Sequence, residues 1–217
     1  MKFKVYKNEK QLRNEEFYFN DQKIILIFHG LFGRAKNWHS IALRISSIFD
    51  GAIIVFDLRN HGESGEGSTP WVTWGLDERK DVIAAVNYIS NHKDFTSASI
   101  GLLSICMGSS SSIFAYGMDE ELKNNPKVKT MIAVQPLTYD HFVKAMGLPG
   151  FLVNSGNKYS NGKRGVDLTG DSFLPFAKDI SVPTLVIQNQ NDPMTNLDMV
   201  KDFYNDIAEE KEYLSLN

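Results

Sequence analysis

The stretch Ser99-Ile-Gly-Leu-Leu-Ser-Ile-Cys-Met-Gly-Ser-Ser110 runs from an apolar segment that favours a strand into a segment compatible with a helix. At its centre, Cys106 stands in the order small-x-nucleophile-x-small-small. A nucleophile on a sharp strand-to-helix turn needs this order, because its neighbours must be small where strand and helix nearly touch. Centring the order on Ser104 or Ser109 places a large side chain in a tight position. The stretch therefore predicts a sharp turn that presents the thiol of Cys106.

Two interpretations of this thiol follow from its place in the sequence. On the predicted turn it lies at a helix N-terminus, where unpaired N–H groups carry partial positive charge and favour the reactive thiolate. Alternatively, Cys106 is a small buried hydrophobe at the end of a strand, as free cysteines often are.

Around this stretch, short apolar runs rich in Ile, Val and Phe alternate with amphipathic stretches. This alternation is typical of an α/β fold with a mostly parallel central sheet and helices on both faces. The expected strands are 23–29, 52–57, 98–105, 129–135, 183–190 and 212–216, with 2–6 and 16–20 as a hairpin at the sheet edge. The expected helices are 38–48, 76–92 and 140–146. Gly, Asn, Ser and Asp mark 62–68 and 146–172 as loops.

Length and composition indicate one domain over residues 1–217, with a small lid or loop insertion around 138–178. The chain has 217 residues, 42% of them hydrophobic, which is ordinary for a domain with its own core. With one cysteine, no disulfide forms within the chain. No cofactor or metal ion is expected, because the glycines at 62–67 lack the context of a nucleotide site, and no Cys/His cluster suits zinc.

The charge pattern and the apolar runs limit the expected partners. The formal net charge is -3, with basic residues scattered among acidic ones, so nucleic acid is not an expected partner. The longest apolar runs, 24–28 and 52–56, are far shorter than the ~20 residues that cross a bilayer. Residues 1–16 lack the apolar run of a secretory signal, so we expect a cytoplasmic protein without a membrane partner. The oligomeric state has no signal in the sequence.

A second motif, His29-Gly-Leu-Phe-Gly33, closes the first core strand. A Gly-rich turn at this place lets backbone N–H groups face the space above the sheet. The amide of Leu31 (or of Phe32), together with that of Met107, would then bind the negative oxygen of a tetrahedral intermediate.

The third motif, Asp57-Leu-Arg-Asn-His-Gly-Glu-Ser64, makes the resemblance to a known family specific. With 28–33 and Asn37-Trp38, it is similar to small acyl esterases of the α/β-hydrolase superfamily. The resemblance implies that the His-Gly motif supplies the oxyanion hole and that the Asp-x-Arg-x-x-Gly-x-Ser turn braces the next loop. Those esterases carry serine at the turn, whereas Cys106 resembles the nucleophile of dienelactone hydrolases. The resemblance runs from about residue 17 to the end, most strongly over 24–64 and 98–112.

The family order of nucleophile, acid and histidine then implies the other members of a catalytic triad. Asp192, in the Asn-Asp-Pro turn after the strand at 183–190, resembles the acid, with Asp140 as an alternative unless it caps the helix at 140–146. No histidine follows Asp192; histidines occur at 29, 39, 61, 92 and 141. Three interpretations stay open: a truncated form of a longer enzyme, a natural loss of the base, or a stand-in histidine, for which His141 is the candidate.

The expected function is hydrolysis of an ester, thioester or lactone by attack of Cys106. Without a base, release of the acyl group by water should suffer most, because water needs deprotonation and a thiolate does not. Apolar residues within 138–178, such as Phe142 and Phe151, suit a small acyl or aromatic substrate. The alternatives are a catalytically inactive protein that binds a ligand or partner in the same cleft, and a prolyl-type peptidase.

Overall fold

The computed structural model describes residues 2–7, 10–12, 23–67, 71–92, 95, 97–165, 167–168 and 172–217. Its strands are β1 (Lys2–Lys7), β2 (Lys10–Leu12), β3 (Lys23–Phe28), β4 (Ala52–Asp57), β5 (Ser99–Ile105), β6 (Val128–Val134), β7 (Thr184–Asn189) and β8 (Lys211–Leu216). Its α-helices are α1 (His39–Ile48), α2 (Arg79–Asn91), α3 (Met107–Met118), α4 (Glu120–Lys123), α5 (Tyr139–Ala145), α6 (Gly150–Arg164) and α7 (Leu197–Asp206). Two 3₁₀ helices, Ala35–Trp38 and Leu174–Asp179, complete the described elements.

The strands form an eight-stranded sheet in the order β2-β1-β4-β3-β5-β6-β7-β8. From β4 across to β8 the neighbouring strands are parallel, while β1 runs antiparallel to β4 and to β2. This confirms the predicted mostly parallel sheet, and the six predicted core strands lie within a residue or two of their expected bounds. The hairpin partner of β1 is 10–12; the strand predicted at 16–20 lies outside the described residues.

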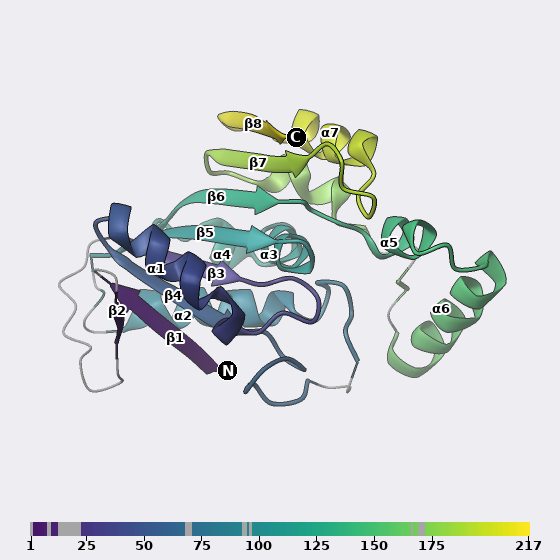
Figure 1. Cartoon of the computed structure of the whole chain (residues 1–217), viewed down its shortest axis with the longest axis horizontal. Coiled ribbons are helices and arrows are strands. Elements are labelled where there is room, and N and C mark those ends of the chain that lie inside the picture. Colours follow the sequence, from purple (N-terminus) through teal and green to yellow (C-terminus); the bar gives the residue numbers. More distant parts are fainter. Residues whose placement is uncertain are drawn as a thin grey trace.

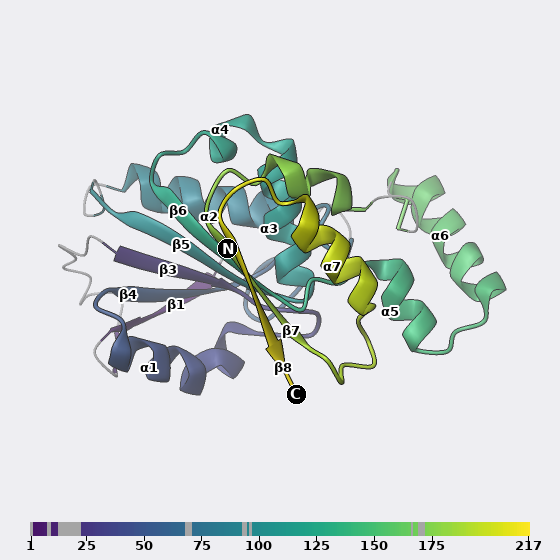
Figure 2. The same ribbon diagram turned by 90° about the horizontal axis from the view of Figure 1, so that it is seen from above.

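Helices cover the two faces of the sheet unequally. Helix α1 lies on one face, and α2, α3 and α7 lie on the other (Figure 2). The larger core forms on the second face, where Val82 of α2, Ile113 of α3 and Phe203 of α7 pack against the strands. The smaller core lies under α1. Among the described residues, no helix is long and apolar enough to cross a lipid bilayer.

On the face of the sheet that carries α1, the aliphatic side chains beyond this helix are half-exposed. Leu103, Ile132 and Leu185 follow one another in register across β5, β6 and β7, and each is half-buried. A hollow of about 340 Å³, lined in part by Leu103 and Ile132, lies on this face. Its floor includes Gly101, where the sheet has no side chain.

The prediction of a loop over 146–172 is wrong for residues 150–164, which form α6. Two residues of this helix with described side chains, Val153 and Ser160, are buried, and the others are exposed or half-buried. The helix therefore lacks an apolar stripe with helical spacing, which is the signal that sequence analysis uses. Helices α5 and α6, which we call the cap, project beyond the carboxyl ends of the parallel strands (Figure 1).

Candidate active site

Cys106 occupies the sharp turn between β5 and α3. Its φ and ψ are 55° and -119°, in a region that L-residues other than glycine rarely adopt. Hydrogen bonds hold the turn: the Cys106 amide donates to the Val134 carbonyl at 2.8 Å, and Ser109 Oγ donates to the Ser104 carbonyl at 2.6 Å. A strained backbone fixed in this way is common at functional sites. The turn that the sequence predicts is therefore present, with the thiol at the N-terminus of α3.

Two glycines let the turn and the end of β3 approach each other closely. A Cβ on Gly108 would lie 2.3 Å from the Phe28 carbonyl oxygen, and a Cβ on Gly30 would lie 2.9 Å from the Cβ of Cys106. The first of these places requires glycine, because backbone fills the space that a side chain would need. The loop after β3, which carries Leu31, is thereby held against the thiol.

The backbone amides of Met107 and Leu31 interact with the thiol of Cys106 in the direction that lowers its pKa. Burial nevertheless raises the pKa of the thiol above its ordinary value, although the two amides act in the opposite direction. The nearby Asp192 carboxylate also raises this pKa. The amide of Met107 at the helix terminus favours thiolate as expected, but the net effect is the opposite, because desolvation outweighs the contribution of the two amides.

We expect the alkylation rate of Cys106 by iodoacetamide to keep rising as the pH passes 9. Raising the pKa of an acid means that its anion forms at higher pH, and the thiolate fraction falls tenfold for each pH unit below the pKa. At neutral pH the folded protein should therefore react more slowly than the same thiol in urea, which serves as the control. Mass spectrometry of timed samples measures both rates. If the pKa of the thiol in the folded protein is equal to or lower than its pKa in urea, the expectation is contradicted.

Asp192 follows β7 and is held by three donors. Gln135 Nε2 and Thr195 Oγ1 donate to its Oδ2 at 2.7 and 2.6 Å, and the Met194 amide donates to Oδ1 at 2.9 Å. Gln135 comes directly after β6 and has a positive φ of 48°. Sequence analysis did not identify Gln135 or Thr195; the place of Gln135 at the carboxyl end of a core strand was the available signal.

His29, His141 and Asp140 have other partners. Buried His29 bonds through Nδ1 to the Gly30 carbonyl at 2.8 Å, and its Nε2 accepts from the Leu58 amide at 3.2 Å. His141 Nδ1 lies 2.6 Å from Thr138 Oγ1, three residues earlier in the chain. Asp140 pairs with Lys144 along α5. Among the described residues, no hydrogen bond joins a histidine to Asp192.

The third motif, 57–64, begins at the last residue of β4 and braces the loop that carries Leu31. Asp57, which is 4% exposed, accepts from the Ala35 amide at 2.6 Å and from the Glu63 amide at 3.1 Å. Arg59 makes a two-pronged salt bridge to Asp81 of α2. Phe32, the alternative to Leu31, has a φ of 58° and a side chain that is 84% exposed.

Comparisons with known proteins find solved structures that resemble this chain over nearly its whole length. No family model matches the sequence. An abhydrolase domain-containing protein of Schizosaccharomyces pombe is 48% identical over 40 residues, which are 18% of this chain and 15% of that protein. An esterase of Pyrococcus furiosus has a TM-score of 0.67 at 20% identity, over 91% of this chain and 74% of that one. A lipase-esterase related protein of Clostridium acetobutylicum has a TM-score of 0.65 at 16% identity, over 100% and 90%. At such identities the likeness establishes a shared fold.

Proposed function

Because the chain has the α/β-hydrolase fold, we propose that it is a hydrolase that attacks an ester, thioester or lactone through Cys106. The observation that carries this proposal is a thiol on a strained turn that interacts with the amides of Leu31 and Met107. Donors fixed beforehand around a nucleophile stabilise negative charge at the moment it develops. The likeness to esterases supports the same class of reaction.

In the first step, the sulfur of Cys106 bonds to the acyl carbon of the substrate. The acyl oxygen takes the negative charge and moves to the amides of Leu31 and Met107, which replace their contact with the sulfur by a contact with the oxyanion. The bond to the leaving oxygen or sulfur then breaks, and the leaving group takes the proton of the thiol. The product is a thioester on Cys106.

In the second step, water attacks this thioester, and the acid and the free thiol are released. Water needs a base, and the Asp192 carboxylate has Gln135, Thr195 and Met194 as its described partners. A general base contributes on the order of 100- to 10000-fold to such steps. We therefore propose that Cys106 is acylated faster than it is released.

The test is the reaction of the protein with p-nitrophenyl acetate. We expect a burst of nitrophenol, an acetyl adduct on Cys106 in the mass spectrum, and slow turnover afterwards. The Cys106→Ala variant should give neither burst nor adduct. A Cys106 that stays unmodified by the ester, while iodoacetamide labels it, would refute the proposal.

A second candidate function is ligand binding without turnover. It is favoured by the raised pKa of the thiol and by the lack of a histidine bonded to Asp192 among the described residues. The same experiment separates the two, because a binding protein would give equal background rates for the wild type, for Cys106→Ser and for Cys106→Ala.

A further inference from the structure

A buried carboxylate holds the turn that precedes α2. The side chain of Glu78 is fully buried and accepts from the Thr73 amide at 3.0 Å, the Gly75 amide at 2.9 Å and Thr73 Oγ1 at 2.7 Å. These donors stand on either side of Trp74, whose φ is 55°. A positive φ on so bulky a residue is strained, and strain of this kind persists where the surroundings fix it, often at ligand clamps.

This turn packs against the helix that begins directly after Cys106. A Cβ on Gly75 would lie 2.7 Å from the Ser111 amide nitrogen and 2.9 Å from the Cβ of Ser110. Ser110, one helical turn from Cys106, also donates to the Leu137 carbonyl at 2.8 Å. Trp74 and the segment that leads into α5 therefore both lie beside the first turn of α3.

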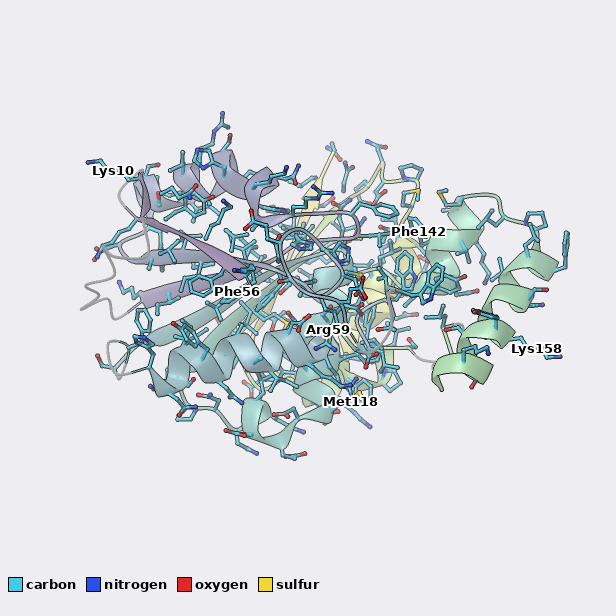
Figure 3. All side chains as sticks on the ribbon, turned by 90° about the horizontal axis from the view of Figure 1, so that it is seen from below. Lys10, Phe56, Arg59, Met118, Phe142 and Lys158 are labelled. Atoms are coloured by element: carbon cyan, nitrogen blue, oxygen red, sulfur yellow. The ribbon has the colours of Figure 1, made fainter. Side chains whose placement is uncertain are left out.

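Three aromatic side chains meet there, which we call the aromatic wall: Trp74, Tyr139 and Phe142. The ring of Trp74 lies 4.6 Å from that of Phe142 and 5.4 Å from that of Tyr139, with the second pair edge to face. All three are half-buried. Phe142 lies where the cap meets the rest of the molecule (Figure 3). The wall thus leaves part of its aromatic surface uncovered, on segments that lie beside the first turn of α3.

We propose that the aromatic wall binds the acyl part of the substrate and selects acyl groups that carry an aromatic ring. The proposal rests on the proposed function and assigns its substrate class. Half-buried rings offer edges and faces to a further ring, and such pairs are favoured beyond the area that they bury. A saturated ring of the same size lacks this additional attraction between aromatic rings. Phe142 is one of the apolar residues within 138–178, whereas Trp74 comes from a separate segment of the chain.

The test compares p-nitrophenyl phenylacetate with p-nitrophenyl cyclohexylacetate, which differ in the aromaticity of one ring. The rate of acylation of Cys106 is measured for each ester and divided by its rate with free N-acetylcysteine, which removes differences in intrinsic reactivity. We expect a preference for phenylacetyl of about fivefold. Phe142→Leu and Trp74→Leu should each bring the preference close to one, and Tyr159→Leu, an aromatic-to-leucine change at a cap residue that is 56% exposed, should leave it unchanged.

The outcomes separate this proposal from the proposed function. If both esters acylate Cys106 at equal normalised rates, the proposal for the aromatic wall is overturned and the proposed hydrolase function is not affected. A preference that survives in both Trp74→Leu and Phe142→Leu also overturns it. If neither ester acylates Cys106, the hydrolase proposal fails; NMR titration with phenylacetate and cyclohexylacetate then tests the wall by itself. Tighter binding of phenylacetate that Phe142→Leu removes supports the wall, and equal binding overturns it.

Discussion

Gly108→Ala is expected to lower the free energy of unfolding by about 3 kcal/mol or more, or to prevent folding. The added Cβ would lie 2.3 Å from the carbonyl oxygen of Phe28 and 2.7 Å from that of His29. Both neighbours are backbone atoms of β3 and its end, which sit in the middle of the sheet and cannot rotate away. Urea denaturation followed by tryptophan fluorescence measures the loss.

Gly101→Ala is the matched control for Gly108→Ala, seven residues earlier in the same strand-to-helix unit. Its Cβ would meet Cγ2 of Thr130 at 3.3 Å, beside the hollow on the half-exposed face of the sheet. That methyl group has room to shift, and alanine suits a strand better than glycine does, so the change should stay within about 1 kcal/mol. Equal losses in the two variants would show that the contact with β3 is not the cause.

Much of the sheet could be predicted because its strands have a simple signal. The six residues of β4, Ala52–Asp57, are all buried, and the first five read as a continuous apolar run. Such a run, between segments with helical spacing, predicts a central strand of a parallel sheet. The turn at Cys106 could be predicted for a similar reason, since the close approach of Gly108 to β3 demands small residues at fixed offsets.

The features that the sequence did not predict depend on contacts between distant segments. The hydrogen bond from Gln135 to Asp192 joins loops 57 residues apart, and no local pattern marks either partner for the other. The strained φ of Trp74 occurs beside Gly75, which packs closely against Ser110 and Ser111 of the distant helix α3. The raised pKa of Cys106 is likewise a consequence of burial, which a position in the sequence does not reveal. Helix α6 escaped prediction because most of its side chains are exposed.

Asp57→Ala is expected to lower the free energy of unfolding by about 3 kcal/mol, since it leaves two amide donors without an acceptor. The carboxylate lies in the interior and accepts from the amides of Ala35 and Glu63. It thereby ties the loop after β3 to the loop after β4. Urea denaturation measures the loss, and Asp50→Ala, at an exposed aspartate before β4, is the control.

The same variant should also slow the acylation of Cys106 in molecules that remain folded. The loop that Asp57 braces contains Leu31, whose amide interacts with the thiol of Cys106. A donor that is no longer held in place stabilises developing charge less, because the protein must reorganise during the reaction. We expect a fall of about tenfold in the acylation rate with p-nitrophenyl acetate, measured well below the unfolding midpoint. A variant that loses stability but keeps the full acylation rate would show that the amide of Leu31 does not depend on this brace.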